Sequence, residues 1–464
     1  MYAGYFNERS EKTMDKRIMI VGTGSGCGKT TVTCGIMKAL KNKNREVAPF
    51  KCGPDYIDPM FHKAVLGIDS HNLDIFLAGK SKIRQLAQSY SIGHRAVICE
   101  GVMGYYDGVG ASSEASSWHV AVCADFRSIL VIRPKGASLS LAAVIKGMAE
   151  FREDSRIAGI FLNDCSPALY KSLAPMLEEE TGIPVLGYLP HMEEAVFKSR
   201  HLGLYTAGEI KDLKERIGII ADKIEETVDF DRILEIYNSE DCEEQGECSE
   251  AVHNGPVIAV ARDDAFNFCY SETLEAWQKE GAEVQYFSPM KDKQVPADAS
   301  ALYLPGGYPE IYARELSENT SMLQSVRACR EAGMPIVAEC GGFLYLGRSL
   351  EDSEGKIYNM AGVLEGDGRK QSRLVRFGYA SIKAKEDSML FAKGESVPVH
   401  EFHYWDSSEN GDSFNAYKKT GDRKWQCGFA DETMYAGFPH LYFAGDNNMA
   451  ARFVEAAEKY RRNR

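Results

Sequence analysis

The stretch "VGTGSGCGKTT", Val21 to Thr31, follows an apolar run and precedes a segment with helical spacing, and it decides the fold of the first half of the chain. The common phosphate-binding loop reads Gly, four residues, then Gly-Lys-Ser/Thr. Counting back from Lys29 puts Thr23 where that pattern has its first glycine, with Gly22 one place earlier. A strand that ends in such a loop and continues as a helix directs backbone N–H groups at an anion. The sequence therefore predicts a nucleotide-phosphate site despite the departure at Thr23.

Short apolar runs alternate with helical segments on the C-terminal side of this loop. In the first half these runs are "EVAPFKCG", "RAVICEG", "SILVIRP", "IAGIFLND" and "PVLGYLP". Each ends in Gly, Asp or Pro or in Glu-Gly, which is typical of buried parallel strands covered by helices on both faces. A second alternating series begins with "PVIAVARD" and continues to "PIVAECGG", and the runs from roughly 360 to 445 are shorter, which favours an antiparallel extension. The predicted fold class is α/β, with two domains that are each a mainly parallel sheet with helices on both faces.

Composition bounds the rest of the organisation. The 464 residues carry a net charge of −13, which argues against a nucleic-acid-binding protein, and no apolar run is long enough for a membrane span. Residues 1–16 are polar and are predicted to be a disordered lead-in, with Met14 as an alternative start, and the acidic stretch 238–255 is predicted to be a linker between domains at 17–237 and 256–464. The 12 cysteines have no zinc-type spacing, so we expect a reducing, cytoplasmic location.

Several residue types around the loop suit a nucleotide and a metal ion. Lys29 is expected to reach the β- and γ-phosphates, and the Thr30 hydroxyl to face Mg²⁺. Asp55 and Glu100 end or follow strands, where they would either bind Mg²⁺ or cap the backbone, and Lys51 would balance phosphate charge. The predicted nucleotide-binding residues are Thr23, Gly24, Ser25, Gly26, Gly28, Lys29, Thr30, Thr31 and Lys51, and the predicted metal ligands are Thr30, Asp55 and Glu100.

A second site is predicted from "PIVAECGGFLYLG", in which a strand, Cys340 and two glycines precede an apolar helical run. This pattern resembles a nucleophile elbow, where the helix N-terminus favours the thiolate and the next N–H, from Gly341, holds an oxyanion. A second oxyanion donor would come from Gly307 in "LYLPGGYPE", and His440 in "FPHLYF" is the expected base. His400 and His403 lie in "VPVHEFHYW", where we expect a structural or substrate-lining role rather than a metal site.

Together these motifs, with "FKCGPDYIDP", "NLD" and "EGVMGYYDG", occur in the order found in the cobyrinate a,c-diamide synthase family, and the resemblance covers about residues 17 to 450. The first half also resembles dethiobiotin synthetase and the second half class I glutaminases. The triad glutamate that usually stands two residues after the histidine is replaced by Tyr442, so the resemblance implies a Cys340–His440 dyad.

The resemblance implies a reaction and further residues. Cys340 would release ammonia from glutamine, and MgATP would phosphorylate a carboxylate of cobyrinate, which ammonia then converts to an amide, first at the c and then at the a side chain. Tyr56 and Asp107 would lie near this substrate, although Asp107 is equally typical of a turn. The basic run "GRKQSRLVRFGY" is a candidate for binding a polycarboxylate, and a homodimer remains open.

Two kinds of alternative are kept. Sister enzymes with the same motifs amidate hydrogenobyrinate or Ni-sirohydrochlorin. A different class is the partitioning-type switch ATPase, here with an inactive glutaminase-like domain, but the signature lysine that these proteins carry early in the phosphate loop is missing from "GTGSGC".

Overall fold

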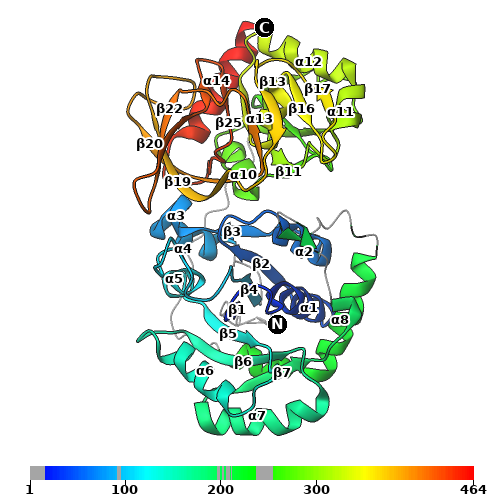
Figure 1. Cartoon of the computed structure of the whole chain (residues 1–464), viewed down its shortest axis with the longest axis vertical. Coiled ribbons are helices and arrows are strands. Elements are labelled where there is room, and N and C mark those ends of the chain that lie inside the picture. The colour runs from blue at the N-terminus through cyan, green and yellow to red at the C-terminus, as the bar shows by residue number, and fades with distance from the viewer. Residues whose placement is uncertain are drawn as a thin grey trace, which may run out of the picture.

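A computed structural model gives the fold and describes residues 16–90, 96–195, 199–200, 203–204, 210, 212–236 and 254–464. Figure 1 shows two lobes stacked along the long axis, the first built from the N-terminal half and the second from the C-terminal half. The predicted lead-in, apart from Lys16, and the predicted linker up to residue 253 lie outside the described residues. Within the described ranges, no helix is long and apolar enough to span a membrane.

The first domain is built on a seven-stranded sheet in the order β3-β2-β4-β1-β5-β6-β7, and all its strand pairs are parallel. Its strands are β1 (Lys16–Gly22), β2 (Val47–Cys52), β3 (His71–Leu73), β4 (Ala96–Glu100), β5 (Arg127–Ile132), β6 (Ile157–Asn163) and β7 (Val185–Leu189), with a separate hairpin of β8 (Ser199–Arg200) and β9 (Gly203–Leu204). Its helices are α1 (Lys29–Asn42), α2 (Ile57–Leu66), α3 (Ile75–Ala78), α4 (Lys80–Ser89), α5 (Ser117–Cys123), α6 (Ser140–Glu150), α7 (Pro167–Thr181), α8 (Leu213–Thr227) and α9 (Phe230–Glu235), with a 3-10 turn η1 (Glu193–Ala195).

Alternation along β1 shows how the sheet is buried on both faces. Ile18 and Ile20 join a core with α1, α2 and α8, whereas Met19 and Val21 join a second core with α4 to α7. All four side chains are fully buried. Strands that are apolar on both faces suit a parallel sheet between two helical layers, as the sequence predicted. The carboxyl ends of β1, β2 and β4 therefore meet at one edge of the sheet.

The second domain has a six-stranded sheet in the order β12-β10-β13-β15-β25-β24, parallel except for the edge pair β24–β25. Its strands are β10 (Val257–Ala261), β11 (Phe266–Phe268), β12 (Glu283–Phe287), β13 (Ala299–Leu304), β14 (Gly306–Gly307), β15 (Ile336–Glu339), β16 (Ser349–Glu351), β17 (Ile357–Asn359), β18 (Asp367–Lys370), β19 (Arg376–Ala384), β20 (Ser396–His403), β21 (Trp405–Ser407), β22 (Phe414–Lys418), β23 (Lys424–Cys427), β24 (Phe429–Ala430) and β25 (Met434–Gly437). Its helices are α10 (Ser271–Lys279), α11 (Ala313–Glu318), α12 (Thr320–Glu331), α13 (Gly341–Leu346) and α14 (Met449–Asn463).

The tail of this domain forms the predicted antiparallel extension and adds one unexpected strand. β20, β19, β22 and β23 form a four-stranded antiparallel sheet, which buries one face against α10, α14 and the central sheet. β25 instead returns to the central sheet and pairs in parallel with β15. The sequence did not predict this return, because the short run at 434–437 resembles its antiparallel neighbours. The return brings the segment that follows β25 next to the end of β15.

Candidate active site

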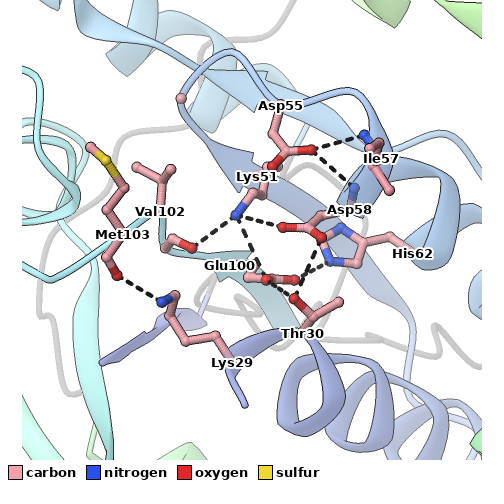
Figure 2. A network of polar contacts seen from close by, with 12 residues as sticks. Lys29, Thr30, Lys51, Asp55, Ile57, Asp58, His62, Glu100, Val102 and Met103 are labelled. Atoms are coloured by element: carbon pink, nitrogen blue, oxygen red, sulfur yellow. Dashed lines mark hydrogen bonds and ion pairs between the residues drawn. The ribbon is translucent and has the colours of Figure 1, made fainter. Parts of the chain in front are cut away.

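The phosphate loop connects the end of β1 to the start of α1, and its path depends on glycine. Gly28 has φ +97°, and a Cβ atom there would lie 2.0 Å from Nδ2 of Asn163. That amide donates to the Cys27 carbonyl oxygen at 2.9 Å, so the last residue of β6 holds the backbone of the loop. Lys29 Nζ donates to the Gly24 carbonyl oxygen at 3.0 Å. It also donates to the Met103 carbonyl oxygen at 2.7 Å (Figure 2). The predicted strand, loop and helix are thus arranged as an anion site requires.

An acidic centre faces the first turn of α1 (Figure 2). Thr30 Oγ1 donates to Oε1 of Glu100 at 2.6 Å and lies 3.4 Å from Oδ1 of Asp58. Lys51, only 2% exposed, places Nζ 2.9 Å from Oδ2 of Asp58 and 3.6 Å from Oε1 of Glu100. His62 Nε2 lies 2.9 Å from the other Glu100 oxygen. Two carboxylates from separate elements therefore converge on the Thr30 hydroxyl.

Charge interactions set the protonation of this centre. Burial opposes ionisation of Glu100, but Lys51 and His62 outweigh it and lower the pKa of Glu100 to about 2. Burial also disfavours the charged Lys51, yet Asp58 and Glu100 hold its pKa above the ordinary range. Burial together with the neighbouring Asp55 and Glu100 carboxylates raises the pKa of Asp58. A centre that gathers excess negative charge in this way favours a cation.

The donor set fits Mg²⁺ in type. Mg²⁺ prefers oxygen ligands and takes one or two carboxylates from a protein, the rest being phosphate and water. Asp58, Glu100 and Thr30 supply such oxygens. Across the described part of the chain, no group of three or more His, Cys, Asp or Glu side chains is placed to hold a metal ion by itself.

Asp55, a predicted metal ligand, lies beside this centre with a different contact. Its Oδ1 accepts the backbone N–H groups of Ile57 at 2.8 Å and Asp58 at 3.1 Å, so it caps the start of α2. Asp58, three residues later, is the carboxylate that contacts Thr30 and Lys51. Sequence reasoning missed Asp58 and His62. The second aspartate of "PDYIDP" was the available signal, but the spacing does not tell which aspartate caps the helix.

The other residues predicted for this half are spread around the loop. Thr31 Oγ1 donates to the Ala195 carbonyl oxygen at 3.1 Å, so it braces α1. Asp107 is exposed, and its Oδ2 accepts the Gly104 N–H at 2.9 Å in a turn beside the phosphate loop. Tyr56 points to the second domain, where its ring centroid lies 5.3 Å from that of His440. Of Thr31, Asp107 and Tyr56, only Tyr56 contacts the histidine that is predicted to act with Cys340.

The thiol site has the geometry of a nucleophile elbow. Cys340 follows β15 and has φ +47°, a positive φ that is uncommon for a residue with a side chain. Gly341 is the first residue of α13, so no earlier turn accepts its N–H. The Gly307 nitrogen lies 3.0 Å from the position that a Cβ on Gly341 would take. The two predicted oxyanion donors, Gly307 and Gly341, are therefore neighbours beside Cys340.

His440 reaches Cys340 because β25 returns to the central sheet. The His440 N–H donates to the His400 carbonyl oxygen at 2.9 Å, which fixes its backbone against β20. A Cβ on Gly306 would lie 2.5 Å from Cε1 of His440, so this position has no room for a side chain. His440 Nδ1 lies 3.6 Å from Oε2 of Glu339, which is 1% exposed. Glu339 was missed by the sequence reasoning, although it directly precedes Cys340.

The protonation of His440 reflects both neighbours. Burial disfavours the imidazolium, but a hydrogen bond to Cys340 and the Glu339 carboxylate outweigh it and raise the pKa of His440 to about 10. Glu339 is held in turn by the Tyr303 hydroxyl and the Leu441 N–H, both at 2.9 Å. A charged imidazole beside Cys340, with a buried carboxylate on its far side, is an arrangement that suits a cysteine nucleophile and its base.

The remaining histidines and the basic run have contacts inside the second domain. Burial, His440 and Lys418 lower the pKa of His400 to about 3. His403 stacks on Phe438 with ring centroids 3.7 Å apart, so a structural role fits both histidines. In the basic run, Arg369 lies 3.5 Å from Asp367, and Arg376 lies over the Trp425 ring.

Comparisons with known proteins identify both domains. Residues 18–202 match the model of the CobQ/CobB/MinD/ParA nucleotide binding domain, and residues 257–448 match the CobB/CobQ-like glutamine amidotransferase domain. The chain is 39% identical over 445 residues to a cobyrinate a,c-diamide synthase of Clostridium tetani, covering 95% of this chain and 100% of the relative. The enzymes of that name from Listeria innocua and Salmonella typhimurium are 38% and 37% identical, over 92% and 95% of this chain and 96% and 98% of theirs.

The fold and the two sites define a glutamine-dependent amidotransferase, in which a nucleotide-binding domain is joined to a glutaminase domain. More specifically, the chain belongs to the cobyrinate a,c-diamide synthase family. The family model of the first domain also carries the names MinD and ParA. A switch ATPase is nevertheless the poorer description, because this chain has a glutamine amidotransferase domain and matches its synthase relatives over nearly its full length.

Proposed function

We propose that this protein amidates the a and c carboxylates of cobyrinate, using ATP, Mg²⁺ and ammonia released from glutamine. One observation carries the proposal: the loop between β2 and α2 places Tyr56 against His440, and the first turn of α2 directly after it places Asp58 at the phosphate loop. One short segment therefore borders both sites. The relatives that bear the name of this reaction match over nearly the full chain.

At the glutaminase site the Cys340 thiolate attacks the side-chain amide carbon of glutamine. The N–H groups of Gly307 and Gly341 hold the oxyanion that forms, and the His440 imidazolium gives its proton to the leaving ammonia. Water, deprotonated by His440, then hydrolyses the thioester to glutamate. Glu339 orients the imidazole and stabilises its charged form during both steps.

At the synthetase site the phosphate loop, Gly24 to Thr31, binds the ATP phosphates, with Lys29 neutralising the transferred γ-phosphate. Mg²⁺, held by Thr30, Asp58 and Glu100 with Asp55 close by, would neutralise charge on the phosphates. The substrate carboxylate takes the phosphoryl group, and ammonia displaces phosphate from the acyl phosphate to give the amide. Tyr56 and Asp107 lie at the border of this site and remain proposed substrate neighbours.

The test is turnover of the purified protein with glutamine, MgATP and each of three tetrapyrroles: cobyrinate, hydrogenobyrinate and Ni-sirohydrochlorin. We expect cobyrinate to give a monoamide and then a diamide in successive mass spectra, together with ADP and glutamate. Amidation of the nickel or metal-free compound alone would overturn the substrate assignment. ATP hydrolysis without any amide product would overturn the reaction class.

A further inference from the structure

The loop that borders both sites, residues 53–56, accepts two hydrogen bonds from one buried side chain. Asn72 in β3 is 2% exposed, and its Nδ2 donates to the carbonyl oxygens of Gly53 and Asp55, both at 2.8 Å. Asp55 caps α2 and Tyr56 follows it, so these two hydrogen bonds fix the backbone on which both residues depend.

Asn72 is in turn held from the other domain. Its backbone N–H donates to the carboxylate of Glu272, which is 1% exposed and lies on α10 of the glutaminase domain. Figure 1 shows α10 at the edge of the glutaminase lobe that faces β3. The same segment has a second contact with the glutaminase domain, because the Tyr379 hydroxyl of β19 donates to Oδ2 of Asp74 at 2.7 Å. The glutaminase domain is therefore hydrogen-bonded to the segment from Asn72 to Asp74 at both of its ends.

The loop closes the connection by returning to the glutaminase site. The Tyr56 ring lies parallel to Phe268, with centroids 5.2 Å apart, and 4.5 Å from Tyr270. Its other neighbour is the His440 ring, described above. Phe268 belongs to β11, which pairs with the Gly306–Gly307 strand next to His440. A movement of the 53–56 loop would therefore uncover the base of the glutaminase and shift the start of α2 at the same time.

We propose that Asn72, anchored by Glu272, is a positioning residue that couples the two active sites, holding the 53–56 loop so that ammonia released at Cys340 is used at the synthetase site rather than lost to water. This inference rests on the proposed function. It adds two residues, one from each domain, that control the stoichiometry between glutamate and amide through the position of the loop.

The experiment measures glutamate formed per amide formed in the full-length protein, with glutamine, MgATP and cobyrinate. Coupled turnover gives a ratio near one. Asn72→Ala removes both loop hydrogen bonds, and Glu272→Ala removes the acceptor for the Asn72 N–H. Because couplings between sites are typically about 5- to 150-fold, we expect both variants to raise the ratio by about 5-fold or more. Glu272→Gln keeps an acceptor oxygen and should stay close to the parent ratio.

A matched control is available within the same chain. Asn319, 7% exposed, also donates its Nδ2 to two carbonyl oxygens, those of Pro289 at 2.8 Å and Asp292 at 2.7 Å, but inside the glutaminase domain. Asn319→Ala should leave the ratio unchanged. An unchanged ratio in both Asn72→Ala and Glu272→Ala, or an equal rise in Asn319→Ala, would overturn the proposal.

Two further outcomes separate the inference from its foundation. If Asn72→Ala does not fold, the test is the comparison of Glu272→Ala with Glu272→Gln. Equal ratios of glutamate to amide in these two variants would refute the coupling. If the parent protein forms no amide from glutamine at all, the proposed function fails. If the parent is coupled and the variants are too, the inference alone fails.

Discussion

Replacing Glu339 by Gln tests whether a carboxylate from the nucleophile strand takes the role of the missing triad glutamate. The substitution keeps size and shape and keeps an oxygen that can accept the Leu441 N–H. It removes the negative charge 3.6 Å from Nδ1 of His440. The variant therefore changes the electrostatics of the site while leaving its packing in place.

The magnitude follows from this distance. Two unit charges 3.6 Å apart interact by about 4–5 kcal/mol at an effective dielectric constant of 20, as an upper limit. An opposite charge at such a distance commonly changes a pKa by about 1 to 3 pH units. We therefore expect Glu339→Gln to lower the pKa of His440, which is about 10 in the parent, by roughly that amount. The imidazolium then loses its proton at lower pH, so the high-pH limb of activity moves down.

The assay is the pH dependence of glutamine hydrolysis, together with the rate at which iodoacetamide alkylates Cys340, corrected with Cys340→Ala for other thiols. Glu401→Gln is a matched control, since this buried glutamate places Oε2 3.8 Å from Nε2 of His403 in the same domain. A narrowed pH profile in Glu339→Gln but not in Glu401→Gln is the expected result. Identical profiles for Glu339→Gln and the parent would refute the assignment.

Three further predictions follow from single contacts. Cys340→Ala should lose amidation from glutamine and keep amidation from free ammonia, measured by product mass, and loss of both activities would contradict two separate sites. Lys51→Met leaves the buried Asp58 and Glu100 carboxylates without their cation. It should therefore reduce the free energy of unfolding, measured by urea titration, by about 3–5 kcal/mol, and added Mg²⁺ should restore part of that loss. A loss below about 1 kcal/mol would show that the ion pairs are not formed. Burial raises the pKa of Glu272 to about 8, so the folded protein holds this proton more tightly than the unfolded chain does. The protein should therefore lose stability as the pH rises from about 4.5 to 8, and Glu272→Gln should flatten that decline. An unchanged slope of the unfolding free energy against pH in the variant would contradict this prediction.

Local patterns were sufficient for the elements and for the residues that sit on them. Each apolar run of the first half became a strand of one parallel sheet, because strands buried on both faces need continuous apolar sequence. The thiol site was equally readable, since an elbow is a contiguous strand, nucleophile and helix. Lys29, Thr30, Glu100 and Cys340 were predicted in this way.

Residues that act through contacts between segments far apart in the chain could not be predicted from the sequence. Asp58 and Asp55 are alternatives on one helix start, and the orientation of α2 against β4 decides which of them faces Thr30. Glu339 meets His440 only because β25 pairs with β15. Asn72 and Glu272 are 200 residues apart, and although Asn72 belongs to the "NLD" motif, the sequence gives no sign that it meets Glu272.

By itself the sequence determined a phosphate loop, a thiol elbow and the parallel strands that carry them, because each is specified by neighbours along the chain. Only the tertiary structure decided which carboxylates face Thr30 and His440, and that the loop after β2 touches both sites. The physical reason is that a charge acts over a few ångströms in space, whatever the separation in sequence. The second carboxylate of each site and the link between the sites therefore depend on how the helices and strands pack.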